Sequence, residues 1–127
     1  ALDVHMYDIP LALNLMHHTS LEQQIPFYKY LFGSSQKSQA QLSPINYVQN
    51  DKIKPFLIIS AGLKRKTPQN VSNQVSSAFK TALENAGHKA RHYHFPRRHH
   101  SSLTKKFSNP NNRVKKAINF FLHNINL

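Results

Sequence analysis

Residues 54–68, Lys-Pro-Phe-Leu-Ile-Ile-Ser-Ala-Gly-Leu-Lys-Arg-Lys-Thr-Pro, are the stretch that decides the fold we expect for this chain. Residues 56–59 are apolar at every position, which is typical of a strand covered on both faces inside a parallel sheet. Small residues follow, and Thr67-Pro68 then predicts a helix that begins with a capping threonine and a proline. The predicted unit is strand, tight loop and helix. In such sheets, ligand-binding and catalytic groups collect in the loops after the strands.

Downstream of this unit the sequence predicts a helix, a strand and a second helix. Apolar residues recur at helical spacing from Val71 to Ala86, and Gly87 stands where a C-terminal cap belongs. Residues 88–95 alternate and end at a proline, which predicts the next strand. Asn109-Pro110 then introduces a closing helix, whose apolar stripe is formed by Val114, Ala117, Ile118, Phe121, Leu122 and Ile125.

Upstream of the unit, the apolar residues Leu2, Val4 and Met6 alternate with Asp3, His5 and Tyr7. This pattern predicts a short strand over residues 2–7. We expect this strand to end near residues 8–10. Residues 34–41 are rich in Ser and Gln and are expected to form an exposed loop. A chain of 127 residues holds one core. We therefore expect a single α/β domain over residues 1–127, with about three parallel strands and flanking helices.

An aromatic patch precedes Gly33 and consists of Phe27, Tyr28, Tyr30, Leu31 and Phe32. Our interpretation is local packing over the edge of the sheet. The alternative is a surface that binds an apolar substrate.

The charge of the chain is strongly positive, with 17 Lys and Arg against 5 Asp and Glu and a net charge of +12. Such a field attracts polyanions and anionic surfaces. The candidate anion-binding residues follow two predicted strands and are Lys64, Arg65, Lys66, Arg97 and Arg98. An ordinarily basic protein, or one that lacks an acidic partner segment, is the alternative. No aromatic stacking platform or nucleic-acid-binding motif is evident, so we expect no nucleic-acid partner.

Two classes of protein are excluded by composition. The chain has no cysteine, which rules out a disulfide framework, a thiolate nucleophile and a cysteine zinc site. It has no run of eighteen apolar residues, so we expect no membrane span.

The order of these motifs resembles the C-terminal half of an α/β-hydrolase of the esterase and lipase group. The resemblance is carried by Tyr7-Asp8 at the end of the first predicted strand, by residues 42–48, by residues 55–59 and by residues 95–103. The last of these stands where the family has its catalytic-histidine loop. The resemblance implies that His100 is a general base, which takes a proton from a serine hydroxyl and returns it to the leaving group. His99 lies one position away and is the alternative.

The chain departs from the family at two places. Lys64 stands where the family has an aspartate, and a cation cannot accept the histidine N–H. Asp8, at the end of the preceding predicted strand, is the substitute that we consider. No Gly-x-Ser-x-Gly motif occurs, so the resemblance places the nucleophile and the oxyanion loop in a sequence upstream. The serines of this chain, including Ser60, Ser101 and Ser102, lack that context, and we do not expect any of them to be a nucleophile.

The resemblance therefore implies a fragment of a carboxylic ester or amide hydrolase, inactive as an isolated chain. Completed by the missing N-terminal half, it would act on a small-molecule ester and need no cofactor. The alternative is a noncatalytic basic module that holds an anionic partner. The far edge of the first predicted strand would lack a neighbour, which predicts a partner chain, a homo-oligomer through that open edge, or poor solubility.

His92 and His94 stand at alternate positions of a predicted strand and would project to one face. Imidazoles on one face, together with His99 and His100, are a set that zinc, copper or nickel can use. No carboxylate or cysteine stands nearby in the sequence to complete the set. We therefore expect adventitious metal binding and no functional metal site.

Overall fold

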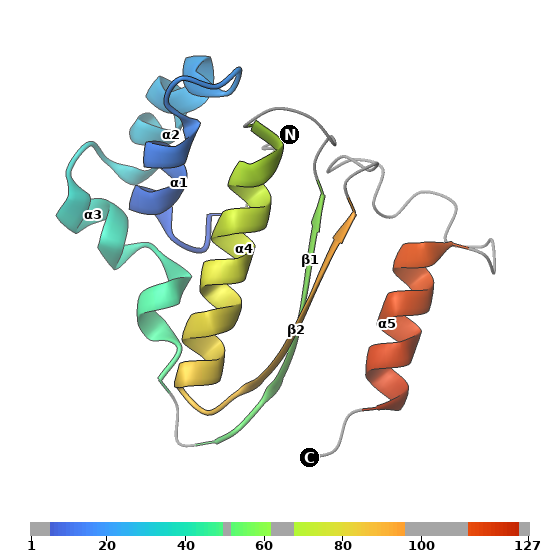
Figure 1. The fold of residues 1–127 in the computed structure, drawn as a ribbon. Coiled ribbons are helices and arrows are strands. Elements are labelled where there is room, and N and C mark those ends of the chain that lie inside the picture. The colour runs from blue at the N-terminus through green and yellow to red at the C-terminus, as the bar shows by residue number, and fades with distance from the viewer. Residues whose placement is uncertain (1–5, 50–51, 62–67, 96–111, 125–127) are drawn as a thin grey trace.

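The computed structural model describes residues 6–49, 52–61, 68–95 and 112–124. In chain order it contains α1 (Ile9–Met16), the 3-10 turn η1 (Glu22–Gln24), α2 (Ile25–Phe32), α3 (Gln36–Gln41), the 3-10 turn η2 (Pro44–Tyr47), β1 (Pro55–Ala61), α4 (Pro68–Asn85), β2 (Lys89–Phe95) and α5 (Arg113–His123). Figure 1 shows α4 between the helices α1 to α3 and the two strands, with α5 on the other side of the strands. None of the helices in these residue ranges is long and apolar enough to cross a membrane.

The strand, helix and strand predicted around residues 54–95 are confirmed. β1 and β2 form a parallel pair, in register from Pro55 opposite Lys89 to Ala61 opposite Phe95, and α4 connects them. The prediction that Gly87 forms the C-terminal cap of this helix is also confirmed, since α4 ends at Asn85. Gly87 has φ +92°, and His88 N–H donates to the Leu83 carbonyl at 2.9 Å, the arrangement of a Schellman cap.

The third strand that we expected at residues 2–7 is not confirmed. Residues 1–5 lie outside the described residues, Met6 and Tyr7 are not in a strand, and the described part of the sheet has two strands. The reason is local to α1. Asp8 caps this helix, since its carboxylate accepts the Leu11 N–H at 3.2 Å, and Pro10 lies in the first turn. The helix-start residues Asp8 and Pro10 therefore account for the backbone directly after Tyr7.

The expected exposed loop at residues 34–41 is wrong, because most of this segment is α3. Ser35 caps the helix by accepting the Ser38 N–H at 3.1 Å. Gln39 is buried, and its amide donates to the Gly33 carbonyl at 2.9 Å. Ser35 and Gln39 thus have defined hydrogen bonds, which a composition rich in Ser and Gln does not reveal.

The main hydrophobic core lies between the N-terminal helices and α4. It contains Ile9, Ala12, Leu13 and Met16 of α1, Ile25 and Tyr28 of α2, and Val71 and Val75 of α4. Within the predicted aromatic patch, Tyr28 is fully buried, whereas Phe27, Tyr30 and Leu31 are exposed. Local packing therefore accounts for Tyr28, and its neighbours in the core are α1 and α4 instead of the sheet edge.

His88, directly before β2, is hydrogen-bonded to the segment that precedes β1. The Lys54 N–H donates to Nδ1 of this buried ring at 3.1 Å, and Nε2 lies 2.7 Å from the Val48 carbonyl. Because a backbone N–H occupies Nδ1, the ring proton is on Nε2 and donates to Val48. The imidazole thus ties the segment before β1 to the start of β2.

Candidate functional site

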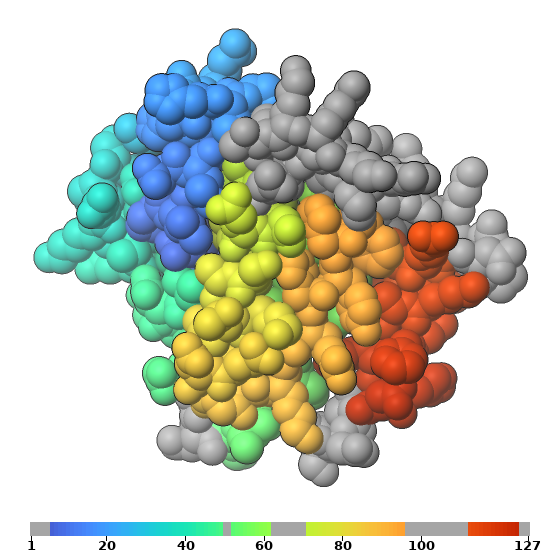
Figure 2. Space-filling view, in the orientation of Figure 1, coloured from blue at the N-terminus to red at the C-terminus, as the bar shows by residue number. Residues whose placement is uncertain are grey.

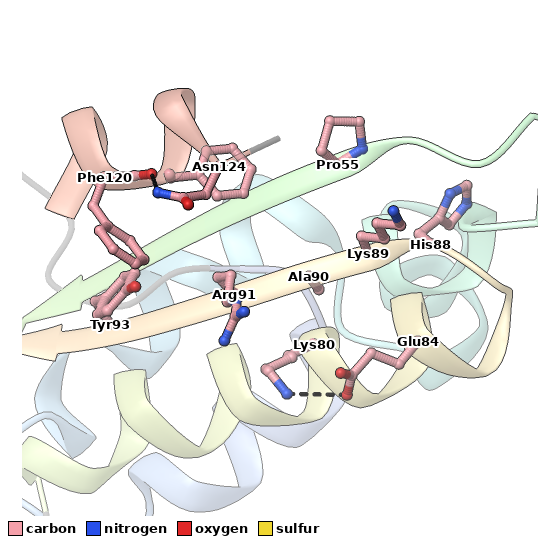
Figure 3. Close-up of a pocket in the computed structure, with 11 residues that line it drawn as sticks. Pro55, Lys80, Glu84, His88, Lys89, Ala90, Arg91, Tyr93, Phe120 and Asn124 are labelled. Carbon is pink, nitrogen blue, oxygen red and sulfur yellow. Dashed lines mark hydrogen bonds and ion pairs between the residues drawn. The ribbon is translucent and has the colours of Figure 1, made fainter. Parts of the chain in front are cut away.

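A pocket of about 560 Å³ lies between α4, β2 and α5. Figure 2 shows β2 reaching the surface between α4 and α5, and Figure 3 shows the pocket from close by. It is lined by Pro55, Lys80, Glu84, His88, Lys89, Ala90, Arg91, Tyr93, Phe120, Phe121 and Asn124. Its volume is in the range of pockets that bind small molecules.

The strand periodicity explains how β2 carries cations and an aromatic ring on one face, and in Figure 3 the guanidinium of Arg91 extends from there toward α4. Side chains alternate between the two faces of a strand. His92 lies on the face toward α4, since its ring is within 3.5 Å of the Ser77 hydroxyl. Lys89, Arg91 and Tyr93 therefore share the opposite face, on which α5 lies. In Figure 3 the ring of Phe120 reaches from α5 toward Tyr93.

The pocket is electrostatically positive, with three cations against one carboxylate in its lining. The carboxylate, Glu84, is engaged by Lys80 one helical turn away, with an N–O distance of 3.0 Å. Arg91 is exposed and forms no ion pair with any residue in the described ranges. Its guanidinium is therefore available for a carboxylate or a phosphate.

One wall of the pocket is aromatic and is formed by Phe120 and Tyr93. Phe120 keeps 58% of its surface exposed, and Tyr93 is half-buried. The end of α5 is held in place near this wall, because the Asn124 amide donates to the Phe120 carbonyl at 2.7 Å. The pocket thus offers a ligand both cationic groups and an exposed aromatic ring.

A second polar cluster lies between the sheet and α4. The hydroxyl of Ser60 lies 2.6 Å from Nε2 of His92 and 2.7 Å from Nδ1 of His94. A hydroxyl has one proton, so one ring N–H donates to the Ser60 oxygen while the hydroxyl donates to the other ring. As the sequence predicted, the two imidazoles project to one face.

Burial lowers the pKa of His94 below its ordinary value of 6.5. The folded state therefore keeps this ring neutral while the unfolded chain binds a proton below pH 6.5. The stability that His94 contributes is present above pH 6.5. It is lost as the pH falls from 6.5 toward the lower pKa of the folded state.

The chemistry of this cluster is limited by its burial. Ser60 has no exposed surface, so its hydroxyl does not meet a substrate in this conformation. The described residues contain no group of three His, Cys, Asp or Glu side chains that could hold a metal ion. The network is best explained as a polar link between the two strands and α4.

Most of the site residues predicted from the sequence lie outside the described residues: Lys64, Arg65, Lys66, Arg97, Arg98, His99 and His100. Asp8 is described, and its carboxylate is half-buried and caps α1. Its action on His100 stays a prediction. β1 ends at Ala61 and β2 ends at Phe95, which are paired in the sheet, so the chain leaves both strands at the same edge.

The residues of the pocket were not selected as a site from the sequence. One signal was available, because Lys89, Arg91 and Tyr93 alternate with His92 and His94 on the predicted strand. Phe120 is next to Phe121 of the apolar stripe of the last helix but does not belong to the stripe, so its side chain lies off the buried face. That β2 and α5 line the same pocket depends on the tertiary fold.

Comparison of the chain with protein-family models, with curated proteins and with solved structures gave no significant match. The resemblance to α/β-hydrolases therefore stays an expectation from the sequence.

Proposed function

We propose that the chain is a noncatalytic binding module that holds an anionic ligand in the pocket between α4, β2 and α5. The observation that carries this proposal is the lining itself, in which Lys89 and Arg91 stand beside the ion pair of Lys80 and Glu84, so that the lining keeps a net positive charge. The net charge of +12 supports the same conclusion, since it attracts anions toward the whole surface.

Cations that line one pocket repel one another, and an anion placed among them relieves this repulsion. The walls of a pocket exclude part of the water that would screen the charges, so the attraction exceeds that of a flat surface. Arg91 is the central donor, because its planar guanidinium can form two parallel hydrogen bonds with one anion.

Binding of inorganic polyphosphate tests the proposal. We expect affinity to fall as the salt concentration rises, and Arg91→Ala to weaken binding about tenfold, or roughly 1.4 kcal/mol. The matched control is Arg113→Ala, because Arg113 is also exposed but does not line the pocket. An equal loss in both variants would mean that binding follows the general charge, and the pocket would lose its role.

The hydrolase hypothesis is the second candidate. It is supported by the parallel pairing of β1 and β2, because the two segments that carry Lys64 and His100 follow strands that end at one edge of the sheet. We expect the chain alone to leave a short-chain aryl ester uncleaved. Adding a chain that bears Gly-x-Ser-x-Gly should then produce hydrolysis, and His100→Ala should abolish it.

Asp8→Asn separates the catalytic role of Asp8 from its structural role. Asparagine caps a helix as well as aspartate but carries no charge to stabilise an imidazolium. A loss of the reconstituted activity with unchanged thermal stability would assign the acid role to Asp8. Ester hydrolysis that survives His100→Ala would contradict the hypothesis.

A further inference from the structure

We propose that the ligand of the pocket between α4, β2 and α5 is a single-stranded nucleic acid, with one base placed against Phe120 and Tyr93. This inference rests on the proposed anion binding and adds the chemical class of the ligand. It is carried by the position of exposed aromatic surface beside the cations.

The aromatic wall formed by Phe120 and Tyr93 leaves ring surface open to a ligand. Phe120 is 58% exposed although it lies on the helix that closes the pocket, and Figure 3 shows its ring above Tyr93. A flat base would cover this surface, and stacking on aromatic side chains tolerates any base because each base has a π-face. A ligand that consists of anionic groups alone leaves this wall uncovered.

The spacing of Arg91 and Tyr93 along β2 suits one nucleotide unit. Arg91 and Tyr93 stand two residues apart on the same face of the strand, which is about 6.6 Å along its axis. A base stacked at Tyr93 and Phe120 therefore leaves its sugar and phosphate within reach of the long side chain of Arg91. Lys80, on α4, stands on the other side of the same pocket.

The size and charge of the protein favour a polymer over a single nucleotide. The pocket, of about 560 Å³, accommodates one nucleotide unit. The net charge of +12 extends well beyond the pocket and would act on the phosphates of neighbouring units. The sequence argued against nucleic acid because no stacking platform was visible. Phe120 and Tyr93 supply one only when α5 lies beside β2.

The experiment compares fluorescently labelled oligothymidylate with an abasic oligomer of the same length by fluorescence anisotropy. We expect Phe120→Ala to weaken binding of oligothymidylate by about 5- to 100-fold, the range for loss of a stacked base, and to leave binding of the abasic oligomer unchanged. Phe27→Ala is the matched control, because Phe27 is 53% exposed and lies on α2, outside the pocket. Circular dichroism confirms that each variant is folded.

The outcomes separate this inference from the proposed function. Equal affinity for the two oligomers, with no effect of Phe120→Ala, would overturn base recognition and leave anion binding intact. If Arg91→Ala changes neither affinity, the proposed function fails as well. Tighter binding of polyglutamate than of oligothymidylate would assign the pocket to an acidic peptide and overturn the inference.

Discussion

Replacing Ser60 by alanine is expected to lower the free energy of unfolding by about 2 to 3 kcal/mol at pH 7.5. The hydroxyl is fully buried and is the hydrogen-bond partner of Nε2 of His92 and Nδ1 of His94, at 2.6 and 2.7 Å. Its removal takes one hydrogen bond from each of two ring nitrogens between the sheet and α4. Both rings are half-buried, so water recovers part of the loss.

Ser76→Ala is the matched control for this experiment. Ser76 is also fully buried, but its hydroxyl has no hydrogen-bond partner among the described residues. Alanine removes an unsatisfied polar group and has a higher helix propensity than serine, so we expect stability to rise by about 1 kcal/mol. Urea denaturation of both variants measures the difference. A loss in Ser76→Ala as large as that in Ser60→Ala would show that the cost arises from packing and not from the imidazoles.

The contact of Ser60 with the two histidines illustrates what the sequence could predict here. The apolar run of residues 56–59 predicted β1, and the alternation of residues 88–95 predicted β2, because each pattern reflects burial within one element. The parallel register, which sets Ser60 opposite His94, depends on how α4 packs across both strands. No local pattern joins Ser60 to His94, because 33 residues separate them in the sequence.

The strand that we expected at residues 2–7 is not confirmed, since residues 1–5 lie outside the described residues and Met6 and Tyr7 are not in a strand. Residues 2–7 alternate as a strand does. Directly after them, the Asp8 carboxylate accepts a backbone N–H of the first turn of α1, and Pro10 lies in that turn. Capping by a side chain is a local interaction of about 1 kcal/mol, enough to decide where such a short element begins. The same holds for Ser35 at the start of α3. At Ser35 a helix-capping side chain outweighs a composition that is typical of a loop.

The pocket could be predicted in its parts and not as a whole. The positive charge and the alternation along β2 are visible in the sequence. The apolar stripe of α5 also predicted a buried face, yet Leu122 of this stripe is 59% exposed and Phe120 borders the pocket. How far a helix turns its stripe toward a sheet is set by the side chains on both, which periodicity alone does not give.

Ser43→Ala is expected to lower the free energy of unfolding by about 2 to 3 kcal/mol, because it leaves a buried backbone donor without a partner. The Ser43 hydroxyl accepts the Ile9 N–H at 2.8 Å and donates to the Gln39 carbonyl at 2.8 Å. The carbonyl keeps a second partner, the Leu42 N–H at 3.2 Å. The loss therefore arises mainly at Ile9, whose residue is 1% exposed.

The control for this variant is Ser35→Ala, which removes the exposed cap of α3 and should cost about 0.5 to 1 kcal/mol. Both serines lie beside α3, so the comparison isolates burial from the loss of a hydroxyl. Urea denaturation gives both values. If Ser43→Ala costs no more than Ser35→Ala, water or a shift of α1 must satisfy the Ile9 N–H. Ser43 would then not be what joins the start of α1 to the end of α3.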